Sequence, residues 1–193
     1  DNAVVLCVDE KTQIQALERT QPILPLGLGY AESVTHDYIR HGTTTLFAAL
    51  DIANGQVIAQ CRQRHRHQEF LSFLKRVDVT VPAGLDAHLV VDNYATHKHP
   101  KVRAWLAARP RFHVHYTPTY SSWLNQVERW FAILTQRQIR RSSCASAKDL
   151  IAKIEAYIAA YNAKAHPFVW TVTSEAILEK VERICKVICG TGH

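Results

Sequence analysis

VVDNYATHK, residues 90–98, and SSWLNQVERWF, residues 121–131, are the two stretches of sequence that decide the fold. In the first, an apolar run typical of a buried strand ends in a carboxylate, Asp92. The second has a helical pattern and carries another carboxylate, Glu128, near its start. Between these two acids lie 35 residues, none of which is acidic. An isolated carboxylate in a basic segment either pairs with a nearby arginine or holds a divalent metal ion on a surface that binds a polyanion.

The distribution of charge supports the second interpretation. Residues 1–92 carry 8 basic and 11 acidic side chains, whereas residues 93–193 carry 15 basic and 6 acidic ones. The carboxyl-terminal half is therefore a candidate surface for nucleic acid, although basic helices also serve simply to keep a protein in solution. Five residues are candidate contacts to a DNA backbone: Lys98, Arg129, Arg137, Arg140 and Arg141.

Length and composition indicate one globular domain. The chain has 193 residues, of which 47% are hydrophobic and 21% charged. Its 5 cysteines, an odd number scattered along the chain, do not resemble a disulfide framework, which indicates a reducing compartment. We find no signal peptide and no apolar run of about 18 residues, so we expect a cytoplasmic protein without a membrane span. The chain begins at Asp1 and contains no methionine, and we interpret it as a fragment or an excised domain.

The amino-terminal half predicts strands. Residues 3–8 are apolar on both faces, as in a central strand, and end in Asp9 and Glu10, of which only one can point into a given site. We expect residues 11–41 to be an irregular covering loop. Residues 43–51 and 56–61 are predicted to form a hairpin through Asn54 and Gly55, with Asp51 serving the turn.

The remaining elements alternate between helix and strand. The periodicity predicts helices at 64–77, 100–108, about 147–162 and about 174–187, and strands at 88–92 and 112–116. A further helix is expected after Ser121 or Ser122, with Leu124, Val127, Phe131 and Leu134 on its apolar face and Glu128 bordering the core. The fold class is therefore α/β, with a mixed central sheet, helices on both faces and helices at the carboxyl terminus.

Three carboxylates can meet in this arrangement. Asp9 and Asp92 would lie together if their strands are parallel neighbours, because sites form at the carboxyl ends of such strands, and Glu128 could join them from its helix. Carboxylates brought together repel one another, and divalent cations relieve that repulsion. Two Mg²⁺ ions, for which Mn²⁺ is a usual substitute, would activate the attacking oxygen and stabilise the leaving oxygen at a phosphodiester. Asn93 and Asn125 flank the acids and either orient them or serve a turn and a helix cap.

The motifs VDEKTQIQAL (8–17), RHGT (40–43), LFAALD (46–51), DNYATH (92–97), SWLNQVERWF (122–131) and PFVWT (167–171) closely resemble the IS630 family of bacterial transposases, in the IS630/Tc1/mariner superfamily. The resemblance implies a single RNase H-like catalytic domain over residues 1–193, with a helical extension at about 146–189. It implies a DDE triad of Asp9, Asp92 and Glu128, and Mg²⁺-dependent cleavage at transposon ends with strand transfer into a TA dinucleotide. It also implies a nucleoid-associated enzyme that is at least a dimer on DNA.

Two departures from the family pattern concern DNA binding. The helix-turn-helix region that precedes the catalytic domain in full-length relatives has no room in this chain. Residues 24–35 contain no Lys or Arg, whereas the corresponding segment of relatives is rich in arginine. Two other functions stay open on the sequence: another RNase H-like nuclease such as a junction resolvase, and a catalytically inactive DNA-binding or assembly module.

Other groups of residues have both a functional and a structural interpretation. Cys185, Cys189 and His193 have the spacing of metal ligands on a helix, but glycines at 190 and 192 favour ordinary cysteines. Histidines at 97, 99, 113 and 115 could contact a metal or a phosphate, although hydrogen-bonded or solvated rings are commoner. The aromatic residues at 120, 123 and 130 could stack on unpaired bases, although core packing is the commoner role.

Overall fold

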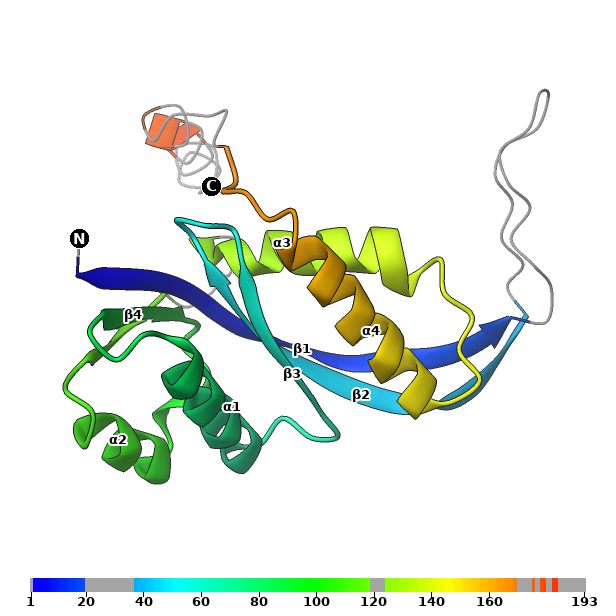
Figure 1. The fold of residues 1–193 in the computed structure, drawn as a ribbon, viewed down its shortest axis with the longest axis horizontal. Coiled ribbons are helices and arrows are strands. Elements are labelled where there is room, and N and C mark those ends of the chain that lie inside the picture. Colours follow the sequence, from blue (N-terminus) through cyan, green and yellow to red (C-terminus); the bar gives the residue numbers. More distant parts are fainter. Residues whose placement is uncertain are drawn as a thin grey trace, which may run out of the picture.

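A computed structural model of the chain describes residues 2–19, 37–118 and 124–169, together with residues 175, 178–179, 182 and 183. Figure 1 shows a central sheet with helices on both sides. The strands are β1 (Ala3–Arg19), β2 (Tyr38–Asp51), β3 (Val57–Arg62), β4 (Asp86–Val91) and β5 (Phe112–Tyr116). The helices are α1 (His67–Thr80), the short 3₁₀ helix η1 (Ala95–Lys98), α2 (Pro100–Ala107), α3 (Gln126–Leu134), the π-helical turn η3 (Thr135–Ile139) and α4 (Ala147–Asn162).

The sheet is mixed, with the strand order β3-β2-β1-β4-β5. Strand β2 is antiparallel to both of its neighbours, β1 and β3, whereas β4 runs parallel to β1 and β5 runs parallel to β4. The parallel pairing of β1 and β4 begins at Ala3 and Asp86 and continues to Val8 and Val91. This order confirms the predicted mixed sheet, and it puts the two strands that end in aspartate side by side at its centre.

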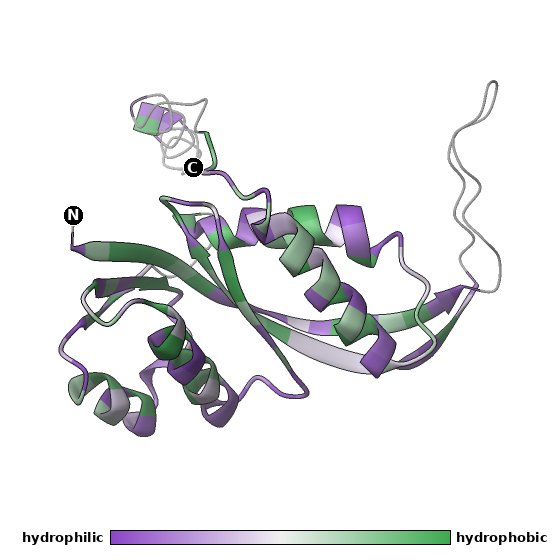
Figure 2. Ribbon diagram, viewed as in Figure 1, coloured by the Kyte–Doolittle hydropathy of each residue, from purple (hydrophilic) through white to green (hydrophobic). Residues whose placement is uncertain are grey.

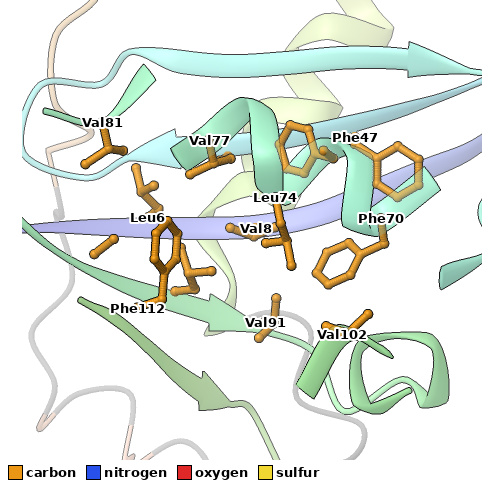
Figure 3. Close-up of a cluster of buried hydrophobic side chains, with 14 of the residues drawn as sticks. Leu6, Val8, Phe47, Phe70, Leu74, Val77, Val81, Val91, Val102 and Phe112 are labelled. Atoms are coloured by element: carbon orange, nitrogen blue, oxygen red, sulfur yellow. The ribbon is translucent and has the colours of Figure 1, made fainter. Parts of the chain in front are cut away.

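Each face of the sheet has its own apolar core, because the side chains of a strand alternate between the faces. On one face, Val8 of β1 and Val91 of β4 pack with Phe47, Phe70 and other residues beneath α1 and α2 (Figure 3). On the opposite face, Cys7 of β1 packs with side chains of α3 and α4. The apolar residues of the helices alternate with hydrophilic ones along the ribbon in Figure 2. Helix α3, for example, buries residues 127, 130, 131 and 134.

Strand β1 is longer than the sequence predicts, and the expected loop at 11–41 is wrong at residues 11–19 and 38–41, while residues 20–36 lie outside the described residues. β1 continues to Arg19 and pairs with β2 from Tyr38, so both strands form one long ribbon that extends from the body in Figure 1. The pairing shifts register between Lys11 and Ile14, and Gln13 there has a φ of 51°. Such bulges bend a strand and tighten its twist, so the polar residues after Asp9 do not show the regular alternation of an ordinary strand.

The second hairpin confirms the roles predicted for Asp51, Asn54 and Gly55. Asp51 Oδ1 accepts hydrogen bonds from the backbone N–H groups of Ala53 (2.9 Å) and Asn54 (3.3 Å). Gly55 has a φ of +72°, and a Cβ there would stand 2.1 Å from the carbonyl oxygen of His166. Glycine is therefore required at position 55 by the positive φ of the turn and by the close approach of the His166 backbone.

Helix α4 covers β3 and ends where the sequence predicts. Asn162, its last residue, makes two hydrogen bonds to Val57, with the side-chain amide donating to the carbonyl and accepting from the N–H, each at 2.9 Å. Ser146 caps the other end by accepting a hydrogen bond from Asp149 N–H. Among the described residues, Cys7, Cys61 and Cys144 are free thiols. Of the helices in the described ranges, none is long and apolar enough to span a membrane.

Candidate active site

The two aspartates lie at the same level of adjacent strands. Val8 and Val91 are partners in the parallel pairing of β1 and β4, and each is followed directly by an aspartate. Asp9 continues along β1, whereas Asp92 begins the loop that follows β4. The predicted placement of these strands as parallel neighbours is therefore confirmed.

Asp9 is a buried carboxylate with a strongly shifted pKa. Only 7% of the residue is exposed. Burial, the largest cause, raises the pKa of Asp9 to about 7, and the charges of Glu10, Glu128 and Asp92 add to the rise, while the hydrogen bond from Glu10 N–H (2.7 Å) opposes it. The free energy that would be released by placing a cation beside this carboxylate is correspondingly large.

Asp92 has the opposite electrostatic environment because of a buried histidine. Burial on its own would raise the pKa of Asp92, but the hydrogen bond and charge of His97 hold it below the usual value. His97 Nδ1 lies 2.7 Å from Asp92 Oδ1, and its Nε2 lies 3.1 Å from Glu10 Oε2. The ring is 1% exposed and packs against Phe70 of α1 at 4.3 Å between ring centroids.

The His97 ring is a cation between two carboxylates. Burial would lower the pKa of His97, but the hydrogen bonds to Asp92 and Glu10 and their negative charges raise it to about 10. Both ring nitrogens therefore donate. Glu10 does not share the face of Asp9, as the alternation of the strand predicts, yet it is connected to Asp92 through this ring. The sequence suggested His97 only as one of four candidate histidines, and its connection to Glu10 had no local pattern to reveal it.

Glu128 lies in the first turn of α3, as the sequence predicts, but its side chain is exposed, so the expectation that it borders the core is wrong. Its negative charge nevertheless contributes to the raised pKa of Asp9. Helix α3 begins after Asn125, not after Ser121 or Ser122, which lie outside the described residues.

Asn125 connects the beginning of α3 to the strand that carries Asp9. Its buried Nδ2 donates to the carbonyl of Val8 at 2.9 Å, so the residue before Asp9 and the helix that carries Glu128 are held together. A role for Asn125 in orienting the acids stays a prediction. Asn93, the other candidate, has an exposed side chain in the loop after β4.

The donor set suits a hard divalent cation. Each aspartate has one oxygen, Oδ1, that accepts a backbone hydrogen bond: from Glu10 N–H to Asp9 and from Tyr94 N–H (3.3 Å) to Asp92. Over the described ranges, Oδ2 of either residue has no hydrogen bond, and carboxylate oxygens are the ligands that Mg²⁺ prefers. In the same ranges no three His, Cys, Asp or Glu side chains already converge as ligands of one ion. The residues fit the metal in kind and in charge, and the Glu128 side chain is exposed.

The predicted DNA contacts are accessible. Arg129 is exposed on α3, with its guanidinium 6.0 Å from the ring centre of Phe168, and Arg137, Arg140 and Arg141 are exposed on and after η3. Lys98 is half-buried at the end of η1, with its ammonium 5.0 Å from the ring centre of Tyr116.

The other candidate residues have structural roles where the structure describes them. Trp130 is completely buried and packs edge-on to Tyr161, so the core role is confirmed. His113 and His115 lie on β5 and stack with His88 of β4, whose Nδ1 is 2.9 Å from His115 Nε2. The residues at 24–35, Tyr120, Trp123, Cys185, Cys189 and His193 lie outside the described residues.

Comparison with known proteins agrees with this geometry. The chain is 34% identical over 113 residues to the "Insertion element IS630 uncharacterized 39 kDa protein" of Shigella sonnei, a match that covers 58% of this chain and 33% of the relative. The chain thus matches only about a third of that protein's length. This confirms the resemblance to IS630 elements.

Solved structures show the same fold. The Mos1 mariner paired end complex with Mn matches with a TM-score of 0.59 and 17% identity, over 81% of this chain and 48% of that one. The pre-cleavage Mos1 transpososome matches with a TM-score of 0.58 and 15% identity, over the same shares. The fold is RNase H-like, as in these transposase catalytic cores. The family model described as "DDE superfamily endonuclease" matches residues 4–151, and the chain belongs to this family as a transposase- and integrase-like catalytic domain.

Proposed function

We propose that this domain cleaves phosphodiester bonds at transposon ends and joins the released ends to a TA dinucleotide in target DNA. Asp9, Asp92 and Glu128 are proposed as its catalytic and metal-binding residues. The observation that carries the proposal is Asp9, a buried carboxylate whose pKa is raised to about 7 by burial and by three neighbouring acids. A fold gains no stability from such a group, and perturbed carboxylates of this kind are typical of catalytic sites.

Each residue would have a distinct part. Asp9 and Asp92 would hold the ions between them, and Glu128 would help to hold one of them. Bound Mg²⁺ or Mn²⁺ would activate the attacking oxygen and neutralise the charge that develops at phosphorus. Mos1 paired end complexes with Mn and with Mg, which have a similar fold, support this choice of ions, and we propose two per site. Asn125 and His97 would keep the acids in position.

DNA is the proposed partner, in the form of transposon ends and target DNA. The neighbours are described as a transpososome and as paired end complexes, which supports this partner and a homo-oligomer of at least two copies on DNA. The exposed arginines at 129, 137, 140 and 141 and Lys98 would contact the phosphodiester backbone. A bacterial cytoplasm is the proposed setting because the relative is from Shigella sonnei.

The test compares two Asp→Asn variants of the same strand. Asp92→Asn changes the proposed site, whereas Asp86→Asn changes an exposed carboxylate at the opposite end of β4. Each protein is incubated with Mg²⁺ or Mn²⁺ and a labelled duplex that ends in an IS630 terminal sequence, next to a plasmid target. We expect the unmodified chain and Asp86→Asn to cleave and to join the 3′ end to the plasmid, and Asp92→Asn to bind DNA without cleaving it.

The products also separate the alternatives. Junction sequences that begin at TA would support transposition, whereas cleavage of branched DNA without joining would favour a resolvase-like nuclease. Full metal-dependent cleavage by Asp92→Asn would overturn the proposed site. Binding of DNA without cleavage by any of the proteins would leave an assembly module as the function.

A further inference from the structure

A second basic surface forms where the amino-terminal ends of α1 and α2 meet. Residues 62–68 and residues 93–103 contribute six Lys or Arg side chains and no acidic one. The two segments are held together by the rings of His67 and His99, which stack with centroids 3.5 Å apart and planes 5° from parallel. We call this region the α1–α2 surface, and its six basic residues are Arg62, Arg64, Arg66, Lys98, Lys101 and Arg103.

The α1–α2 surface contains a hollow beside the candidate active site. It has a volume of about 350 Å³, and its lining includes Arg66, the stacked histidines and Tyr94. Tyr94 is two residues beyond Asp92 and donates its backbone N–H to the carboxylate of that residue. The hollow is therefore lined in part by the loop that begins at Asp92.

The charges of this surface have few counter-ions. Glu69 is the one acid of α1's first turn, and it pairs with Arg66 at 2.8 Å. The structure, in its described ranges, gives no ion pair to Arg64, Lys101 or Arg103, all of which are exposed. Burial, followed by the charges of His99, Lys101 and Arg66, lowers the pKa of His67, while Glu69 opposes the shift. Its Nε2 is buried without a hydrogen-bond partner among the described groups.

An anion would relieve this accumulation of positive charge. The dipoles of α1 and α2 also favour negative charge at their amino-terminal ends. At α2 this effect is only the dipole's, because Pro100 has no N–H and Lys101 N–H already donates to His99 Nδ1. A row of phosphates matches the α1–α2 surface better than a single anion does. The reason is that the basic side chains extend along two segments and the hollow is open to solvent.

We propose that the α1–α2 surface binds the DNA backbone that flanks the reacting phosphate. The inference rests on the proposed function, since it takes DNA as the substrate of the neighbouring carboxylates. The α1–α2 surface lies on the face of the sheet opposite to α3 and η3. DNA that contacts both regions would be held on both sides of the strand ends that carry Asp9 and Asp92. Residues 62–66 belong to the half of the sequence with net negative charge, so the net charges of the two halves do not indicate this basic region.

The test is the salt dependence of DNA binding. Binding of a fluorescein-labelled 30-base-pair duplex is measured by anisotropy in EDTA, from about 50 to 300 mM KCl, for the unmodified chain and for Arg64→Gln/Lys101→Gln. Each phosphate contact contributes about 0.9 to the slope of log affinity against log salt. We therefore expect the double variant to lower the slope by about 1.8 and the affinity at 0.1 M KCl by about tenfold or more.

A second double variant controls for net charge. Lys75→Gln/Lys148→Gln removes the same charge from exposed positions on α1 and α4, away from the hollow. It is expected to leave the slope unchanged. An equal slope for all three proteins, or an equal loss in both double variants, overturns the proposed surface.

The failure of this proposal is distinguishable from the failure of the proposed function. Metal-dependent cleavage by the unmodified chain is measured in parallel. Cleavage together with unchanged slopes removes the α1–α2 surface and leaves the function standing. A lowered slope without any cleavage supports the surface and removes the proposed chemistry.

Discussion

Replacing Asp9 by Asn is expected to stabilise the metal-free fold while it abolishes activity. Asn has the shape of Asp and keeps an oxygen that accepts the hydrogen bond from Glu10 N–H. It removes the ionisation of a group whose pKa is raised from 3.8 to about 7, mainly by burial. A shift of this size corresponds to roughly 4 kcal/mol at 1.36 kcal/mol per pKa unit. Because the site can relax and admit water, we expect a gain of about 2–4 kcal/mol in the free energy of unfolding at pH 8.

The pH dependence of stability tests whether the stabilisation by Asp9→Asn comes from the ionisation of Asp9. The folded chain holds the proton of Asp9 up to about pH 7, whereas the unfolded chain releases it near pH 3.8. The folded state therefore binds more protons between these values, and its stability falls as the pH rises through that interval. The advantage of Asp9→Asn should accordingly be small near pH 4, grow until about pH 7 and stay constant above it. Urea unfolding in EDTA at pH 4.5, 6 and 8, followed by circular dichroism, measures this trend.

Asp92→Asn is the matched control, because the same chemical change is made one strand away. The pKa of Asp92 is held low by His97 in spite of burial, so its ionised form contributes stability above about pH 4 that is lost as the pH falls. We expect this variant to be less stable than the unmodified chain at pH 8. Mn²⁺ should raise the midpoint of thermal unfolding of the unmodified chain and leave that of Asp9→Asn unchanged. A destabilised Asp9→Asn at pH 8, or equal pH profiles for it and the unmodified chain, would refute the reasoning.

Three other changes test the supports of the site and the fold. His97→Gln leaves the Glu10 side chain buried without its cation, and it should lower the free energy of unfolding in urea by about 3–5 kcal/mol. Adding Glu10→Gln to this variant should make that loss smaller, because the buried charge is then removed. Trp130→Ala removes a completely buried ring and should cost about 3–5 kcal/mol by the same measurement; a loss below 1 kcal/mol would contradict its place in the core. Gly55→Ala forces a Cβ to within 2.1 Å of a carbonyl and should lower the midpoint of thermal unfolding, whereas Gly84→Ala, with open space around it, should not.

The sequence predicts most of the elements because their patterns are local. Alternating or continuous apolar runs gave the strands at 88–92 and 112–116, and the Asn54-Gly55 turn placed the hairpin correctly. The continuation of β1 to Arg19 escaped prediction because it depends on pairing with β2, and its polar residues resemble those of a loop. The start of α3 was misplaced for a similar reason: Asn125 uses its side chain to contact β1, and the serines before it were better caps by local propensity.

The triad candidates could be found from the sequence because each ends or begins an element, but their surroundings could not. Burial of Asp9 and exposure of Glu128 depend on how α3 lies over the sheet. In the link from Glu10 through His97 to Asp92, Glu10 and His97 lie 87 positions apart in the sequence, and no periodicity connects them.

The contrast between the two aspartates is itself an argument about function. Asp92 has a buried cation at 2.7 Å, and a purely structural pair of strands would gain by giving Asp9 one as well. Instead, Asp9 is surrounded by three further acids, and the cation that would offset it is not supplied by any described side chain. Because His97 already satisfies one carboxylate of the pair, a metal that enters needs to offset mainly Asp9 and Glu128. On the proposed function, Asp92 would stay ionised at neutral pH, while Asp9 would exchange its proton for a metal ion near pH 7.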